Sequence, residues 1–208
     1  MRKQVDHSHY TDGLYDTRER FLSYWTQIEL IAQAGAQSVL EIGVGVGLVN
    51  YYLKKTGISV TSMDIDPDLG TDLVGSVTDI PLEDNSVDFA LCCQVLEHLP
   101  YDQFVNAVSE LKRVARLGIV LSLPDVTGLV FAGSFRLPKF GMLQGMLTLP
   151  RLRPIENKFD GQHYWEIGKR GFPVDRILAS IGETGINVER HFRLKDNPYH
   201  RFFVLRQA

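Results

Sequence analysis

Residues 38–48 read Ser-Val-Leu-Glu-Ile-Gly-Val-Gly-Val-Gly-Leu, and the rest of the chain is organised around them. Val39, Leu40 and Ile42 form a short apolar run that is typical of a strand buried on both faces. Three alternate glycines follow at once. Because glycine tolerates positive φ and leaves backbone amides accessible, the stretch predicts a strand that turns sharply into a helix whose start binds a ligand.

Glu41 narrows the class of ligand. It lies two residues before the first glycine, where a carboxylate would repel the phosphates of a nucleotide and attract a cationic group. The dinucleotide fingerprint G-x-G-x-x-G would also need glycine at position 48, which is Leu48 here. The motif therefore favours a cationic ligand over a nicotinamide dinucleotide, and a strand and turn without any ligand is the remaining alternative.

The pattern acid-x-Gly-x-Gly-x-Gly resembles the first motif of the class I S-adenosylmethionine (SAM) methyltransferases. The resemblance implies that Glu41, Gly43, Gly45 and Gly47 hold the amino-acid end of SAM and that S-adenosylhomocysteine is the product. It also implies an α/β fold, with a Rossmann-like, doubly wound, seven-stranded and mostly parallel sheet. A C-terminal antiparallel hairpin, whose last strand inserts between the fifth and sixth strands, and a cap insertion complete the expected fold.

Hydrophobic periodicity places the other elements in order. Helices are expected at 18–34, where Gly35 ends the helix, and at 48–55, 101–115 and 174–182. Strands are expected at 58–64, 87–93, 118–124, 186–194 and 200–206, and a further one in the segment that begins at residue 73. The alternation of strands and helices predicts parallel neighbours joined by right-handed crossovers.

Asp64 ends the second expected strand, 19 residues after Gly45 (64 − 45). A doubly wound fold places an acid at about this distance to accept hydrogen bonds from ribose hydroxyls. In the methyltransferases that the chain resembles, the acid at this position does so for SAM, which implies a cofactor-binding role for Asp64 and the adjoining Ile65. The alternative is a solvated acidic loop of Asp64, Asp66 and Asp68.

The segment 73–89 resembles the third strand and following loop of the same methyltransferases. In that pattern an aspartate after the glycine faces the adenine amino group, and this chain has Ser76 there. The expected adenine contacts are therefore the Ser76 hydroxyl, the Val77 amide, and Asp79 as a substitute acid three residues on.

Polar residues follow the fourth expected strand at its carboxyl end, where ligands of open α/β sheets bind. The run Gln94-Val95-Leu96-Glu97-His98-Leu99 resembles the Val-Leu-Glu-His-Leu signature of one methyltransferase subgroup. Gln94 is expected to contact the cofactor. Two roles are open for His98: it caps the helix or bonds to the cofactor loop, or it transfers a proton.

The segment 125–171 mixes glycine, proline, methionine and aromatic residues without a sustained period. We expect an insertion that packs over the carboxyl edge of the sheet as a substrate cap. Within it, His163 is a candidate to take a proton from the acceptor while Glu166 orients it, and a packing histidine is the alternative. Basic residues of the cap would meet an anionic acceptor or serve solubility: Arg136, Lys139, Arg151 and Arg153.

The 208-residue chain is long enough for one sizeable domain and short for two. We expect a single methyltransferase domain with an N-terminal arm and helix (1–36), a SAM-binding core (37–124), the cap (125–171), and a closing helix and hairpin (172–208). The net charge of −3, without a dense Lys/Arg run, disfavours a nucleic-acid partner. The acceptor is therefore expected to be a small molecule.

Two further features bear on location and metal content. No run approaches the ~20 apolar residues of a membrane span, and the N-terminus has no apolar h-region, so we expect a cytoplasmic protein. Cys92 and Cys93 are adjacent, which makes them too close for an ordinary disulfide and too few for a zinc site. No metal site is predicted.

The sequence thus predicts an enzyme that transfers a methyl group from SAM to an O, N or C atom of a small-molecule acceptor. A catalytically silent SAM-binding protein of the same fold is the first alternative, and a nicotinamide-dependent oxidoreductase is the second. The oligomeric state is left open.

Overall fold

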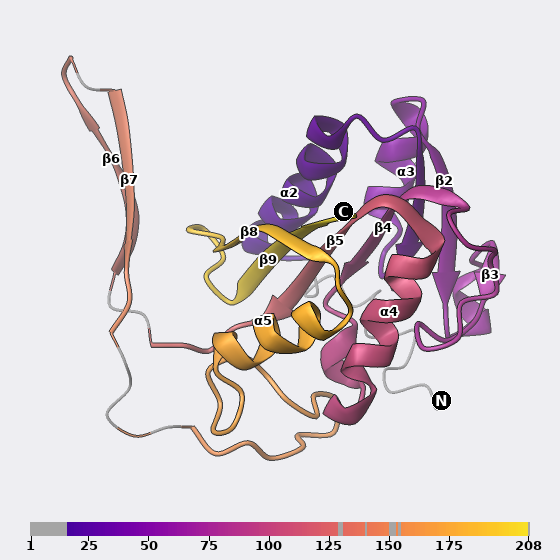
Figure 1. Ribbon diagram of the computed structural model, residues 1–208. Coiled ribbons are helices and arrows are strands. Elements are labelled where there is room, and N and C mark those ends of the chain that lie inside the picture. Colours follow the sequence, from indigo (N-terminus) through magenta and orange to yellow (C-terminus); the bar gives the residue numbers. More distant parts are fainter. Residues whose placement is uncertain (1–15, 129–130, 140, 150–152, 154, 208) are drawn as a thin grey trace.

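A computed structural model describes residues 16–128, 131–139, 141–149, 153 and 155–207. Seven strands form one sheet in the order β3-β2-β1-β4-β5-β9-β8 (Figure 1). Their bounds are β1 (Ser38–Ile42), β2 (Ser59–Asp64), β3 (Leu73–Val74), β4 (Val87–Cys93), β5 (Ala115–Pro124), β8 (Asn187–Arg193) and β9 (His200–Arg206). The predicted fold class is confirmed.

The strand directions are those expected, with parallel strands in the first part of the sheet and an antiparallel hairpin at the C-terminal end. β1 pairs in parallel with β2 and with β4, and the pairs β2–β3 and β4–β5 are parallel as well. β9 is antiparallel to both of its neighbours, β5 and β8. The last strand therefore lies between the fifth and sixth strands of the sheet, as the resemblance implied, and β1 is near the centre.

Helices cover both faces of this sheet (Figure 1). The α-helices are α2 (Arg18–Ala34), α3 (Leu48–Lys55), α4 (Phe104–Val114) and α5 (Val174–Glu183). Three short 3₁₀ turns are η1 (Pro67–Leu69), η2 (Leu96–His98) and η3 (Tyr101–Gln103). Helix α2 ends at Gly35, whose φ of 69° is left-handed, as the sequence predicted for this glycine.

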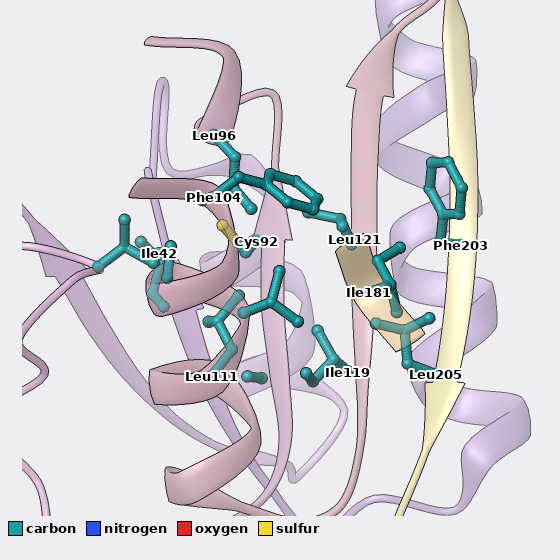
Figure 2. Packing of buried hydrophobic residues seen from close by; sticks show 14 of the residues in the cluster. Ile42, Cys92, Leu96, Phe104, Leu111, Ile119, Leu121, Ile181, Phe203 and Leu205 are labelled. Atoms are coloured by element: carbon teal, nitrogen blue, oxygen red, sulfur yellow. The ribbon is translucent and has the colours of Figure 1, made fainter. Parts of the chain in front are cut away.

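Alternate residues of the buried strands serve two separate cores. Leu40 and Ile42 of β1 pack with α4 and α5, together with Cys92, Ile119 and Phe203 from neighbouring strands (Figure 2). Val39 of β1 points the other way and packs with α2 and α3. Because successive side chains of a strand point to opposite faces, a continuous apolar run supplies both layers.

Two elements begin three residues away from their expected start. β5 begins at Ala115, three residues before the predicted start, because Ala115 pairs with Val87 and its carbonyl accepts a hydrogen bond from the Gln207 side chain. The expected helix 101–115 begins with the 3₁₀ turn η3 and becomes α-helical at Phe104. Both differences lie at the ends of elements, where tertiary contacts determine the residue at which a helix or strand begins.

The segment 125–171 contains a regular element that the sequence did not predict. β6 (Phe131–Leu137) and β7 (Gly141–Leu147) pair antiparallel and form a separate two-stranded sheet that extends away from the main sheet (Figure 1). Arg136 and Lys139 are exposed on this hairpin, as is Arg153 further along the chain. Arg151 lies outside the described residues, as does the expected N-terminal arm up to residue 15. The expectation that this half of the segment packs over the sheet edge is therefore wrong, because the hairpin extends away from the main sheet.

The second half of the segment does pack on the sheet. Val126 N–H donates to the Ile167 carbonyl and Ile167 N–H donates to the Pro124 carbonyl, so residues near 167 follow the end of β5. Trp165 is fully buried, and its indole N–H donates to the Leu99 carbonyl at 3.0 Å. Residues 155–171 thus lie against the turn after β4.

Among the residues that the structure describes, no helix has both the length and the apolar character needed to cross a bilayer. Cys92 is buried and Cys93 half-buried, and both are free thiols.

Candidate functional site

A cleft opens at the carboxyl ends of β1, β2 and β4, where the sequence predicted a ligand. Eight of the ten predicted cofactor residues line it: Glu41, Gly43, Gly45, Asp64, Ile65, Ser76, Val77 and Gln94. Gly47 and Asp79 are not among the lining residues. Of the three predicted catalytic residues, His98 lines the cleft, while His163 and Glu166 do not.

The glycine turn after β1 has the geometry that only glycine accepts easily. Gly43, Gly45 and Gly47 have φ values of 77°, 51° and 74°. A Cβ on Gly43 would lie 2.3 Å from Cγ2 of Val95, so the turn also lacks space for a side chain there. Gly43 N–H donates to the Met63 carbonyl at 3.0 Å, which fixes the turn to the end of β2. Gly47 is instead the N-cap of α3 and borders a second, shallower hollow with Phe21 and Tyr51.

Glu41 is a buried acid in the wall of the cleft, 4% exposed. Its Oε2 has no hydrogen-bond partner among the described residues, and neither has Nδ2 of Asn50. Burial raises the pKa of Glu41 to about 7, although Asn50 and Lys54 favour the charged form. A buried carboxylate oxygen without a partner is costly, so a donor or cation from a ligand would stabilise it in addition to the nearby Asn50 and Lys54.

Asp64 is half-buried at the end of β2. Burial raises its pKa, while the backbone amides of Asp66, Ile65 and Val44 oppose the shift. The Asp66 amide donates to Asp64 Oδ1 at 3.0 Å. Asp66 is itself buried and caps η1, where its carboxylate accepts from the Asp68 amide. The alternative of a fully solvated acidic loop is therefore wrong, because two of these acids line the cleft.

The loop after β3 presents Ser76 and Val77 to the cleft. Ser76 Oγ lies 2.7 Å from Thr78 Oγ1 and accepts from the Thr78 amide, so the hydroxyl closes a local turn. Asp79 follows this turn and is exposed outside the cleft. Its predicted contact with adenine has no support in this geometry.

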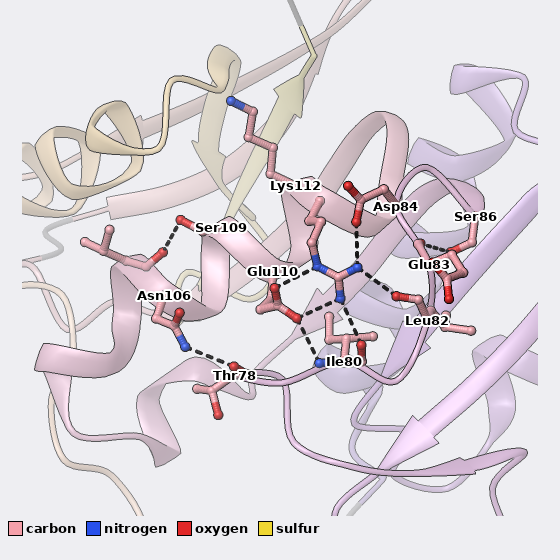
Figure 3. Close-up of polar contacts among 12 residues, drawn as sticks. Thr78, Ile80, Leu82, Glu83, Asp84, Ser86, Asn106, Ser109, Glu110 and Lys112 are labelled. Carbon is pink, nitrogen blue, oxygen red and sulfur yellow. Dashed lines mark hydrogen bonds and ion pairs between the residues drawn. The ribbon is translucent and has the colours of Figure 1, made fainter.

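Side chains of α4 hold the same loop in place (Figure 3). Asn106 Nδ2 donates to the Thr78 carbonyl, and Arg113 donates to the carbonyls of Ile80 and Leu82. Glu110 accepts from the Ile80 amide and pairs with Arg113. These contacts stabilise the wall of the cleft from behind.

Gln94 has an unusual backbone for a residue other than glycine, with φ at 55°. Its amide donates to the Ser122 carbonyl at 2.9 Å, and its side-chain Nε2 donates to Ser122 Oγ at 3.1 Å. Neighbouring Cys93 also lines the cleft, and burial raises the pKa of its thiol to about 12, so it stays protonated and is a poor nucleophile. Gln94 is therefore held to β5 by two hydrogen bonds, and Cys93 presents a neutral thiol to the cleft.

Helix α2 and the start of β9 contribute residues that sequence reasoning missed: Arg20, Tyr24, Gln27 and His200. The 18–34 pattern indicated a packing helix, and no local signal marks its polar residues as part of a site. His200 is buried, and burial together with Arg20 lowers its pKa to about 4, so it is neutral at physiological pH. These residues come from opposite ends of the chain and meet only in the fold.

His163 and Glu166 lie beside the cleft, next to His98. The rings of His98 and His163 meet edge to face with centroids 5.0 Å apart. His163 Nδ1 lies 2.7 Å from Glu166 Oε1, which also accepts from the Tyr199 hydroxyl, while Lys169 pairs with Glu166 Oε2. Burial disfavours the charged imidazole, but the bond to Glu166 prevails and raises the pKa of His163. The predicted His163–Glu166 pair is thus present, one layer behind the cleft wall.

Comparison with known proteins identifies the central part of the chain. A family model described as a methyltransferase domain matches residues 40–122. Two curated relatives, uncharacterized methyltransferases of Mycobacterium bovis and Mycobacterium tuberculosis, are each 29% identical over 109 residues. The match covers 47% of this chain and 45% of each relative, so the chain spans about half the length of the relatives it matches.

Solved structures share the fold over almost the whole chain. The 1,6-didemethyltoxoflavin-N1-methyltransferase of Burkholderia thailandensis, with S-adenosylhomocysteine bound, gives a TM-score of 0.64 at 15% identity and covers 97% of this chain and 84% of its own. The magnesium protoporphyrin IX methyltransferase of Synechocystis, with SAM bound, gives 0.61 at 15% identity and covers 91% and 80%. A SAM-dependent methyltransferase of Aquifex aeolicus gives 0.59 at 18% identity and covers 98% and 100%. Residues 40–122 thus match a methyltransferase domain, and the chain shares the fold of solved SAM-dependent methyltransferases.

Proposed function

We propose that the protein binds SAM in the cleft and transfers its methyl group to an O, N or C atom of a small-molecule acceptor. The observation that carries the proposal is Glu41, whose buried Oε2 has no partner among the described residues and which lines the same cleft as Gly43 and Gly45 of the glycine turn. SAM is a cation with an ammonium and a sulfonium group, so it can bring positive charge to this carboxylate.

The other lining residues fit the remaining parts of SAM. Asp64 ends β2 with a carboxylate suited to accept hydrogen bonds from ribose hydroxyls. Ser76 and Val77 lie further along the same cleft and offer a hydroxyl and an amide to the adenine. Gly43 and Gly45 bring the backbone close to the amino-acid end.

The bound cofactor supplies an activated methyl group, so the protein has mainly to align an acceptor and exclude water. The charge of the chain and the names of two of its structural neighbours support a small acceptor. The net charge is −3, and two of these neighbours are named for small substrates, 1,6-didemethyltoxoflavin and magnesium protoporphyrin IX. The hairpin β6–β7 extends away from the sheet (Figure 1), so we assign the role of acceptor wall to residues 155–171 instead.

His98 is the predicted catalytic residue nearest to the reaction, because it lines the cleft. His163 and Glu166 do not, and we assign them a positioning role behind His98, to which His163 is joined by ring contact. A proton-transfer role for either histidine remains a prediction.

Titration with S-adenosylhomocysteine in a calorimeter tests cofactor binding. Wild type should bind, and Asp64→Ala should lose about 1–3 kcal/mol of binding free energy because a ribose hydroxyl is left unpaired. Asp79→Ala is the matched control, since Asp79 is exposed outside the cleft and should bind as wild type does. Absence of binding by folded wild-type protein would reject the proposal.

Methyl transfer needs a second measurement. Labelled SAM incubated with the protein and a fractionated cell extract should give a labelled small molecule and S-adenosylhomocysteine. Binding of S-adenosylhomocysteine without product in any fraction would instead identify a silent SAM-binding protein. Enhanced NADH fluorescence on mixing would favour the nicotinamide alternative, which Leu48 at the first position of α3 disfavours.

A further inference from the structure

We propose that Glu97, His98 and His163 form a binding site for a divalent transition-metal ion beside the cofactor cleft. One nitrogen of each imidazole and one oxygen of the carboxylate lie within 4.8 Å of one another. Glu97 and His98 belong to η2, and His163 comes from the segment that packs against it. The sequence predicted no metal site, because His163 is distant along the chain from Glu97 and His98.

The segments that carry the three ligands are fixed to each other. The Tyr164 amide donates to the Glu97 carbonyl at 2.9 Å, next to His163 in the chain. Trp165 is fully buried and donates to the Leu99 carbonyl. The two sides of the cluster are therefore held at a defined spacing, which a metal site requires.

Both imidazoles carry the outer partners that metal-binding histidines usually have. His98 Nδ1 lies 3.0 Å from the Gln162 carbonyl, which can only accept, so Nδ1 is the N–H and Nε2 carries the lone pair. His163 Nδ1 lies 2.7 Å from Glu166 Oε1 and donates in the same way. A carbonyl or carboxylate on one ring nitrogen orients the other toward a metal ion.

Glu97 is the observation that points to a ligand. Its side chain is fully buried, and neither Oε1 nor Oε2 has a hydrogen-bond partner among the described residues. A buried carboxylate with both oxygens unsatisfied is strongly unfavourable. A cation between Glu97 and the two imidazoles removes this cost.

A second cluster of Asp160, His163 and Glu166 has similar spacing but is already satisfied. Glu166 accepts from Tyr199 and pairs with Lys169, and Asp160 accepts from the amides of Gln162 and His163. These acids have partners of their own, so the Glu97 cluster is the better site.

Two imidazoles and one carboxylate suit Mn²⁺, Fe²⁺, Co²⁺ or Zn²⁺, whereas Mg²⁺ and Ca²⁺ prefer oxygen ligands alone. Three protein ligands leave coordination positions open. His98 also lines the cofactor cleft, so the open positions adjoin the place where an acceptor would lie.

Co²⁺ is the probe of choice because its visible absorption reports on the ligands. Untagged protein, stripped with a chelator, is titrated with CoCl₂. One equivalent should bind with a d–d absorption band. Glu97→Gln and His163→Gln should each weaken binding at least about tenfold, and Glu166→Gln, which removes the negative charge of the outer partner of His163, should weaken it about 10–100-fold. His191→Gln, at an exposed histidine of β8, is the matched control and should bind as wild type does.

The band must depend on these ligands. A Co²⁺ band that survives Glu97→Gln or His163→Gln, or no band at all with folded wild type, would overturn the proposal. Because Glu97 is fully buried, circular dichroism of each variant accompanies the titration, and His163→Gln decides the matter if Glu97→Gln does not fold. The titration uses the metal alone, so its outcome is independent of whether S-adenosylhomocysteine binds.

Discussion

Arg201 Nε donates to Oδ2 of Asp125 at 2.7 Å, and both side chains are largely buried where β5 and β9 meet. The same Oδ2 lies 3.5 Å from Nε of Arg193 on β8, and Oδ1 accepts from the Thr127 amide. One carboxylate thus joins the last three strands of the sheet to the start of the segment that packs beside the cleft.

Asp125→Ala should lower the free energy of unfolding by about 3–5 kcal/mol, because it leaves two buried guanidinium groups without their counter-charge. Urea denaturation measures the change. The control is Glu189→Ala, which removes an exposed partner of Arg206 in the same pair of strands and should cost no more than about 1 kcal/mol. Equal losses of unfolding free energy in the two variants would contradict the conclusion that Asp125 is the counter-charge of two buried arginines.

Arg113 holds the loop that follows Ser76 and Val77. Its guanidinium donates to the carbonyls of Ile80 and Leu82 at 2.9 and 2.7 Å and to Glu110 through Nε and Nη2. Arg113→Met should cost about 1–3 kcal/mol, since both carbonyls lose their donor.

The loop contacts also predict an effect on binding. Because the loop forms part of the cleft, Arg113→Met should weaken S-adenosylhomocysteine binding together with stability, as measured by calorimetry and urea denaturation. Arg170→Met removes a comparable but exposed pair with Glu156 and should change neither. Loss of stability with unchanged affinity would show that the loop is not coupled to the site.

The fold was predictable because its signals are local. The apolar run 39–42, the glycines after it and the acid at 64 each follow from a few neighbouring residues. Parallel strands then place their carboxyl ends at one edge of the sheet, so eight of the ten predicted cofactor residues converge.

Contacts between segments that are distant in the sequence could not be predicted. Arg20 and His200 meet across the cleft from opposite ends of the chain, and neither has a periodic or motif signal. His163 was singled out, yet its neighbours Glu97 and His98 lie on another element. The hairpin β6–β7 was missed because glycines interrupt the alternation that marks a strand.

Gly43 and Gly47 have the same left-handed φ but different surroundings. Alanine at either position should cost about 1–2 kcal/mol through the backbone. At Gly43 the new Cβ would also lie 2.3 Å from Val95 Cγ2, which adds about 1–3 kcal/mol, whereas nothing in the described chain lies within 4 Å of a Cβ on Gly47.

A double-mutant cycle measured by urea denaturation separates the two costs. Val95→Ala leaves only Cβ of residue 95, which lies 3.8 Å from the position of the new methyl group, so it should restore the packing part of the Gly43→Ala loss. It should give no such rescue to Gly47→Ala. If the losses of Gly43→Ala and Val95→Ala simply add, Val95 does not cause the extra cost, and the contact between the new Cβ and Val95 Cγ2 is relieved by another movement.

Glu41 makes stability depend on pH in a direction opposite to that of a paired acid. The unfolded chain releases this proton near the usual pKa of 4.5, and the folded chain retains it until its raised pKa of about 7. Between these values the folded state binds more protons, so stability falls as pH rises and levels off above about 7. Over the whole window this amounts to about 3 kcal/mol.

Glu41→Gln removes that titration while keeping the shape of the side chain. The difference in unfolding free energy between variant and wild type should therefore move in favour of the variant by about 3 kcal/mol from pH 4.5 to pH 8, as urea denaturation at each pH would measure. Saturating S-adenosylhomocysteine, whose ammonium favours the charged carboxylate, should shrink this difference. A difference that is constant with pH would show that Glu41 is already paired in the folded protein, and its buried oxygen would then no longer point to a cationic ligand.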